Sequence, residues 1–420
     1  MSVITHDVDP NGDLVVVLKK PNTKNVIPEV SLRQETKLGQ NAPTFAPDTT
    51  DVRTPSMPSG LPNNAAIGNA IYLDKYKILL TSTLYVAGES DEIRFRVSSA
   101  HLKLASVQFR GMLSPPWTES QAVNTQSDYT DSGTEDLSPS SSPAEGTGSP
   151  GSPVTSSTGP SPSSPSVSQT PRMWEVTVTE WHAHALLTVF NIIHSKGSSI
   201  PRNVSLEFFA QVALIADYYH CAEALSFVAA TWYSSFEKRA RKYGKEVIMW
   251  LVIALVFSWD FVFHMAAYTV VHGGEGLSRV TIHDLPFLEI LEELNKKRTR
   301  AIFELRQKLR TVDRELRKGE IGCDNTCRSM MVGSLVIEKE TNRDLITTTC
   351  INHNAVSLYK VITAIKEFAP TVWHDSTGCA HACSAAKLIL PSIKQVKDEI
   401  ATITLSDFQH NKDGSSTKGA

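Results

Sequence analysis

The sequence predicts an α+β fold, in which a small sheet is covered by a cluster of helices and is followed by an all-α region. Three strand-like stretches predict the sheet: Leu14–Leu18, the residues around Phe95, and Trp174–Val178. From Ala183 onward, apolar residues recur at intervals of three and four, which predicts the helices. Two long polar stretches interrupt this pattern, so we expect a sheet whose strands are far apart in the chain.

Composition limits the classes of function. The chain has 420 residues and a net charge of -3, so it is not as a whole an electrostatic nucleic-acid binder. Six cysteines are too few for a disulfide scaffold of this length and favour a reducing compartment. The first residues lack the cationic start and apolar run of a signal peptide. We therefore expect the protein in the cytoplasm, the nucleus or both.

The predicted strands differ in their burial. Asp9–Asp13 has the composition of a turn, and the Leu14–Leu18 stretch that follows is apolar throughout, which predicts a strand buried on both faces. Ile93 and Phe95 alternate with charged residues, as in a strand with one buried face. The apolar residues of Trp174–Val178 also share one face. These stretches are the predicted sheet.

A single helix is predicted directly after the second of these strands. Ser98 or Ser99 can cap it, because a serine hydroxyl accepts a hydrogen bond from a free amide of the first turn. Its apolar face follows helical spacing and comprises Leu102, Ala105, Phe109 and either Met112 or Leu113. Later helices are predicted over residues 183–193, 206–216 and 222–232.

Two insertions are predicted to be disordered, at about residues 20–68 and 120–171. Both are polar and proline-rich and lack a hydrophobic period, so they cannot bury enough apolar surface to offset the entropy of ordering. The second contains Ser-Pro pairs that a proline-directed kinase can read, or that simply reflect low complexity. These pairs begin at Ser138, Ser142, Ser149, Ser152, Ser161 and Ser164.

An apolar stretch in the second half resembles a membrane span in length. Val247–Trp259 is continuously apolar and Phe261–Val271 is mostly so, but Asp260 and His264 interrupt the run. A charge in the bilayer core costs on the order of 2.5–3.5 kcal/mol. We therefore expect a buried core helix, with a membrane span as the alternative.

A long basic helix is predicted over Pro286–Lys318. Asp284 can cap this helix, and Pro286 suits its first turn. The helix either packs its apolar seam on its own domain or presents it to a partner helix, or its basic side chains contact nucleic acid. The seam residues are Ile302, Leu305, Leu309, Val312 and Leu316.

Four residues near the C-terminus are candidate metal ligands: Cys323, Cys327, His381 and Cys383. Thiolates and imidazoles at short spacing can supply the tetrahedral ligand set of zinc, and four protein ligands would make the site structural. The spacing is not that of a standard Cys-x-x-Cys pair. Free cysteines without a metal are therefore the alternative. The sequence contains none of the common catalytic or phosphate-binding motifs, so we do not expect an enzyme.

The residue order identifies a family resemblance. VSSAHLKLASVQFRGML, which ends at Leu113, resembles the first helix of the BTB/POZ domain, as found in fungal members. ALLTVFNIIHSK and IPRNVSLEFFAQVALIADYYHCAEAL resemble the later helices of that domain. The resemblance covers roughly Gly12–Leu18, Glu92–Glu119 and Trp174–Trp232. It implies a BTB/POZ-like domain over residues 1–232, a helical region over 233–410 and a disordered tail over 411–420.

The resemblance implies a protein–protein interaction module. BTB domains bind protein partners and form homodimers, so Leu14–Leu18 and the helix beginning near Ser99 are the expected surfaces. An alternative is a substrate adaptor for a cullin-type ubiquitin ligase, in which Trp117 and Glu119 would occupy the cullin-binding element that follows the first helix. A transcription regulator is a further alternative, which only the basic helix supports. We expect no nucleic-acid partner and no membrane contact.

Overall fold

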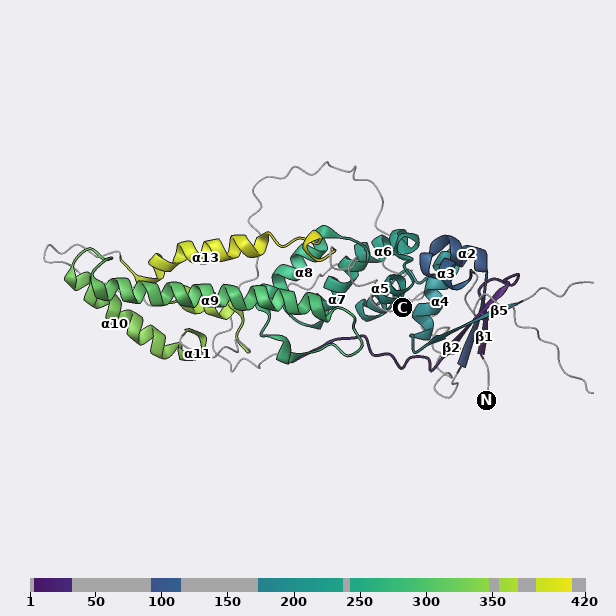
Figure 1. The fold of residues 1–420 in the computed structure, drawn as a ribbon, viewed down its shortest axis with the longest axis horizontal. Helices are drawn as coiled ribbons and strands as arrows, with labels where there is room; N and C mark the ends of the chain where they lie inside the picture. Colours follow the sequence, from purple (N-terminus) through teal and green to yellow (C-terminus); the bar gives the residue numbers. More distant parts are fainter. Residues whose placement is uncertain are drawn as a thin grey trace, which may run out of the picture.

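The computed structural model describes residues 4–31, 92–114, 173–236, 242–346, 355–368 and 383–409. The molecule is elongated, with a small sheet at one end and a long helical arm that reaches the other (Figure 1). Short helices cover the sheet, and further helices lie between them and the arm. The predicted α+β class with a small sheet is confirmed, but the region that follows is mostly helical and not all-α, because it contains the short strand β6 (Val280–Thr281).

The sheet combines strands that are far apart in the chain. In the described residues its order is β1 (Ile4–Asp7), β4 (Glu92–Val97), β2 (Leu14–Lys19) and β5 (Trp174–Thr179). β2 is antiparallel to β4 and parallel to β5, while β1 is parallel to β4. The three predicted strands are therefore neighbours in one sheet.

Strand β2 is the centre of this sheet. Leu14, Val16 and Leu18 are fully buried, as the apolar run predicts. Both edges of the strand are hydrogen-bonded, one to β4 and the other to β5. The expectation that this strand forms a partner surface is therefore wrong, because its side chains and its backbone are already occupied.

The helix that follows β4 is broken in two. Ser98 caps α2 (Ser99–Ala105), and Ser106 ends it and caps α3 (Val107–Met112). The Ser106 hydroxyl accepts a hydrogen bond from the Phe109 amide at 2.9 Å and donates one to the Tyr219 carbonyl. The prediction of one continuous helix is wrong, because the buried Ser106 ends one helix and caps the next although the apolar positions on either side keep their spacing.

The next helices agree closely with their predicted spans. They are α4 (Ala183–Ile193), α5 (Leu206–Tyr218) and α6 (Ala222–Ser235). The 3-10 turn η3 (Gly197–Ser199) follows α4, and Ser205 caps α5 by accepting a hydrogen bond from the amide of Phe208 at 3.1 Å. The predicted boundary at residues 232 and 233 falls inside α6.

The apolar stretch forms two core helices, α7 (Lys245–Val256) and α8 (Asp260–Gly273). Between them the chain turns at Ser258, whose φ is 55°. All residues from Val247 to Val256 are buried. The prediction of a buried core segment is confirmed, as two helices instead of one. No helix in the described part of the chain is long and apolar enough to cross a bilayer.

Aromatic side chains join these helices to the sheet end. Trp250 of α7 meets Phe209 of α5 and Phe236 at the end of α6, with ring centroids 6.2 and 5.2 Å apart. Trp259 lies 4.9 Å from Tyr233 of α6 and 6.3 Å from Phe209. One continuous apolar core therefore runs from the sheet into the helical region.

Residues 20–31, at the start of the first predicted insertion, are ordered. They lead to β3 (Glu29–Val30), which is antiparallel to β6 (Val280–Thr281), the strand that follows the turn η4 (Leu277–Arg279). The Asn22 amide donates to the Trp181 carbonyl at 2.9 Å. The predicted start of disorder at residue 20 is wrong, because backbone hydrogen bonds to distant segments order a stretch that has no apolar period. Residues 32–68, 120–171 and 411–420 lie outside the described residues.

The arm is built on α9 (Leu288–Lys318). The predicted cap is wrong: Phe287 precedes the helix without a side-chain cap, and Asp284 instead accepts a hydrogen bond from the amide of Asn25 at 2.9 Å. The predicted seam is buried, and α9 packs against α8 and against two helices introduced here, α10 (Asn325–Thr341) and α13 (Ala385–Ala401). Packing on its own domain is therefore confirmed.

Two shorter helices complete the described arm, α11 (Arg343–Ile346) and α12 (Leu358–Lys366). Two of the basic side chains of α9, Arg298 and Arg306, are buried. Arg306 donates to the Leu345 carbonyl of α11 at 2.7 Å. These arginines therefore join α9 to the neighbouring segments of the arm by donating hydrogen bonds to backbone carbonyls.

Candidate functional site

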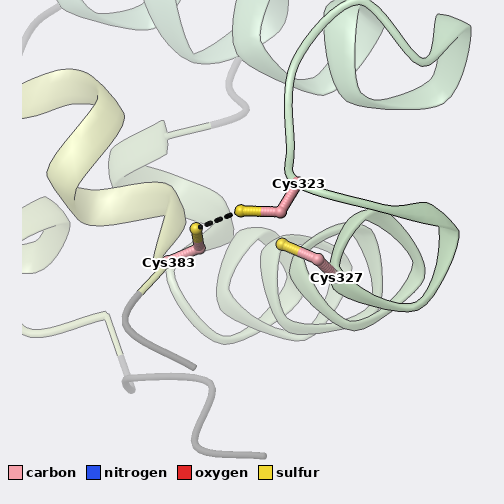
Figure 2. Close-up of side chains that lie close together, drawn as sticks. All are labelled: Cys323, Cys327 and Cys383. Atoms are coloured by element: carbon pink, nitrogen blue, oxygen red, sulfur yellow. Dashed lines mark hydrogen bonds between the residues drawn. The ribbon is translucent and has the colours of Figure 1, made fainter. Parts of the chain in front are cut away.

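Three cysteines meet at the far end of the arm. The sulfur atoms of Cys323, Cys327 and Cys383 all lie within 4.8 Å of one another, and those of Cys323 and Cys383 are 3.4 Å apart (Figure 2). Cys323 comes from the turn between α9 and α10, Cys327 comes from the first turn of α10, and Cys383 comes from the residue pair before α13. The structure therefore brings together three of the four predicted zinc ligands.

The turn before α10 positions two of these cysteines. Gly322 has a φ of 101°, and a Cβ there would lie 2.6 Å from Cγ of Arg328, so the tight turn requires glycine. Asp324 then caps α10, its carboxylate accepting a hydrogen bond from the Cys327 amide at 2.7 Å. This cap sets the first turn of α10, which carries Cys327.

The cluster lies at the border between core and solvent. Cys327 is fully buried, Cys383 is half-buried and Cys323 is exposed. The contact with Cys323, together with loss of hydration and the contact with Cys327, raises the pKa of the Cys383 thiol to about 12. These contacts therefore oppose ionisation of the Cys383 thiol, and a bound cation would favour its thiolate form.

Three predicted site residues lie outside the described residues. They are His381, the predicted fourth zinc ligand, and the predicted cullin-contacting pair Trp117 and Glu119. Their roles stay predictions from the sequence.

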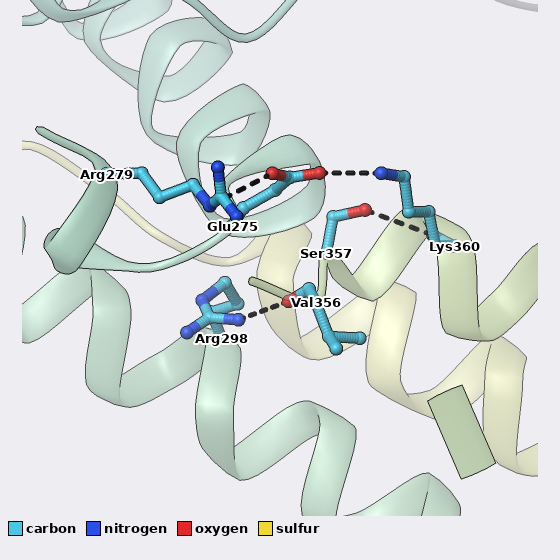
Figure 3. Close-up of polar contacts among 6 residues, drawn as sticks. All are labelled: Glu275, Arg279, Arg298, Val356, Ser357 and Lys360. Carbon is cyan, nitrogen blue, oxygen red and sulfur yellow. Dashed lines mark hydrogen bonds and ion pairs between the residues drawn. The ribbon is translucent and has the colours of Figure 1, made fainter. Parts of the chain in front are cut away.

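A buried polar node was missed by sequence reasoning. Glu275, which follows α8, is 4% exposed, and its carboxylate lies 2.6 Å from Nζ of Lys360 and 3.7 Å from Nε of Arg279 (Figure 3). Arg298 of α9, 1% exposed, donates to the Val356 carbonyl. The node joins α8, α9 and α12. The only sequence signal is an acidic residue set between glycines, in Gly273-Gly274-Glu275-Gly276.

The α2–α3 pair exposes apolar side chains beside a buried core. Leu104 is 81% exposed and Val107 is 65% exposed, although Leu102 and Phe109 of the same helices are fully buried. We call Leu104 and Val107 the α2–α3 face. Single exposed apolar side chains are common on proteins, whereas contiguous apolar patches mark protein contact sites, so the α2–α3 face is a candidate contact surface.

Hydrogen bonds to Asp13, which precedes β2, and to His194, which follows α4, fix the orientation of α2. Asp13 accepts from the Ser99 amide at 2.8 Å and from its hydroxyl at 2.7 Å, and Nε2 of His194 accepts from the Ser98 amide at 2.9 Å. Burial raises the pKa of Asp13, but the Ser99 hydrogen bonds outweigh it, so the pKa is lowered and the carboxylate stays charged. The α2–α3 face is therefore held by a rigid support.

The chain matches no protein-family model, no curated protein and no solved structure in the comparisons made.

Proposed function

We propose that this protein is a BTB/POZ-type interaction module that associates with a second copy of itself through the α2–α3 face. The observation that carries the proposal is the exposure of Leu104 and Val107 on a pair of helices that bury Leu102 and Phe109 in the core. Burying such side chains contributes roughly 25 cal/mol for each Å² of apolar surface removed from water.

Preorganisation supports this surface as a binding site. The hydrogen bonds of Ser98, Ser99 and Ser106 to His194, Asp13 and Tyr219 hold both helices in place before any partner arrives. A surface that is already ordered loses little conformational entropy when it binds, so more of the contact energy appears as affinity.

The arrangement of the sheet supports the BTB/POZ interpretation. A small sheet covered by a helical cluster is what the family resemblance implies, and β4, β2 and β5 with α2–α6 have this arrangement (Figure 1). In a twofold dimer the same patch faces itself, so one apolar face is sufficient for self-association.

The experiment is light scattering coupled to size exclusion on the full chain and on the double variant Leu104→Asp/Val107→Asp. We expect the wild type to have the mass of a dimer and the variant that of a monomer, because the dimer would bury the introduced carboxylates. The matched control is Ile337→Asp on α10, which is 67% exposed and lies in the arm. Its mass should equal that of the wild type.

Two results would contradict the proposal. A monomeric wild type at all concentrations would exclude self-association. A dimer that persists in the double variant, with an unchanged circular dichroism spectrum, would place the interface elsewhere.

A further inference from the structure

We infer that Cys323, Cys327 and Cys383 together bind one zinc ion at the end of the arm. The geometry of the three sulfurs supports this assignment. Tetrahedral zinc with zinc–sulfur bonds of about 2.3 Å holds its sulfur ligands about 3.8 Å apart. The Cys323–Cys383 separation of 3.4 Å and the limit of 4.8 Å for all three sulfurs lie on either side of that value.

A disulfide fits the cluster less well than a metal. A disulfide has a sulfur–sulfur bond of about 2.05 Å and joins two cysteines only. It would leave Cys327, fully buried, with its sulfur beside the pair and no role in it. Zinc uses all three sulfurs, and their convergence from two separate segments is then explained by one ligand.

The local backbone places the sulfurs between core and solvent. Cys327 lies in the first turn of α10, a helix of 17 residues. The exposure of Cys323 gives an ion access from solvent, whereas the burial of Cys327 protects the site from one side. Asp324 does not compete for the ion through Oδ1, which caps the Cys327 amide.

The ion would staple two segments that are distant in sequence. Cys327 and Cys383 are 56 positions apart, and they lie where α10 begins and where α13 begins. Because the ion would bind only when both segments are folded together, its binding free energy would stabilise the fold and fasten the start of α10 to α13. The site is on the arm and does not depend on the proposed self-association at the sheet end (Figure 1).

The test is metal titration of the reduced, metal-free full chain. Zinc binding is measured by competition with a chromophoric chelator, and cobalt is used as a spectroscopic probe of thiolate coordination. We expect one equivalent of zinc and thiolate-to-cobalt charge-transfer bands in the wild type. Cys323→Ser and Cys383→Ser should each weaken zinc binding at least tenfold and reduce these bands.

The matched control is Cys221→Ala, which removes a buried cysteine at the sheet end and should bind zinc as the wild type does. Circular dichroism verifies that each variant is folded, and Cys323 and Cys383 are chosen because neither is fully buried. At the same zinc concentration, zinc should also raise the Tm of the wild type and of Cys221→Ala more than that of the two serine variants.

Three results would overturn the inference. The first is a reduced wild type that takes up no zinc. The second is zinc binding that is unchanged in both serine variants, which would assign the metal to other residues. The third is a Cys323–Cys383 disulfide, found by mass spectrometry, in a protein whose reduced form does not bind zinc. That result would make the pair a redox couple.

Discussion

His194 shows how a single side chain connects the sheet end to α2. Its Nδ1 lies 2.8 Å from the Phe190 carbonyl, which can only accept, so this nitrogen carries the proton. Nε2 therefore has a free lone pair and accepts from the Ser98 amide. Burial lowers the pKa of His194 although the Phe190 hydrogen bond raises it, so the neutral form required for this contact is favoured.

Acid should destabilise the protein through its buried histidines. Burial lowers the pKa of both His184 and His272 from 6.5 to about 4. Between these values the unfolded chain takes up protons that the folded chain does not, so stability is full above pH 6.5 and falls towards pH 4. Each histidine can account for a loss of up to about 3 kcal/mol in the free energy of unfolding over this pH range.

Urea unfolding at pH 7 and pH 4.5 measures this loss. The loss of unfolding free energy between the two pH values should be smaller in His184→Gln than in the wild type. The control is His220→Asn, which changes an exposed histidine at a φ of 50° to a residue that tolerates that backbone. An acid loss in His184→Gln equal to that of the wild type would refute the assignment.

At the scale of elements, Ser106 decides where one helix ends and another begins. Ser106→Ala removes the cap of α3 and leaves the Tyr219 carbonyl without this donor. We expect a loss of about 1–3 kcal/mol in the free energy of unfolding, because the residue is buried. Chemical denaturation measures it. Ser114→Ala, which removes an exposed hydroxyl bonded to the Arg110 carbonyl, should cost much less.

The polar node joins the elements of the arm through charge. Glu275→Gln removes the carboxylate that faces Lys360 and Arg279 and should cost about 1–3 kcal/mol, less than a fully buried pair because Lys360 is 28% exposed. The same change at the exposed Glu340, which pairs with Arg343, should cost under about 1 kcal/mol. Equal losses in the two variants would show that the node does not stabilise the arm.

Local patterns predict elements, and distant partners decide how they end. Apolar periodicity predicts α4 and the buried seam of α9, because these depend on residues within one helix. It cannot predict that Asp284 serves the Asn25 amide instead of a helix cap, since these residues are 259 positions apart. The ordering of residues 20–31 has the same kind of cause.

The functional residues also fall into those that spacing in the sequence predicts and those that only the folded chain brings together. Short spacing within the sequence identified Cys323, Cys327 and Cys383, and the structure places their sulfurs together. The node around Glu275 gave almost no signal, because its partners on α9 and α12 are adjacent only in the folded chain. A buried arginine such as Arg298 looks in sequence like any other basic residue of a solvated helix face.

At the scale of the whole molecule, the proposed dimer predicts a particular shape. The α2–α3 face lies near the sheet end, so two copies joined there would extend their arms away from each other (Figure 1). Small-angle X-ray scattering should therefore give a maximum dimension for the wild type well above that of Leu104→Asp/Val107→Asp. A dimer as compact as the monomeric variant would contradict an interface at this end.

The pairing of β3 with β6 also delays one step of folding while the chain is being synthesised. Val30 pairs with Val280, so 250 residues must be translated before the partner strand exists. At about 5–20 residues per second the ribosome needs roughly 13–50 s for this length. For that time the edge of β3 is open to other nascent chains, and its length of two residues limits how firmly any of them can bind it.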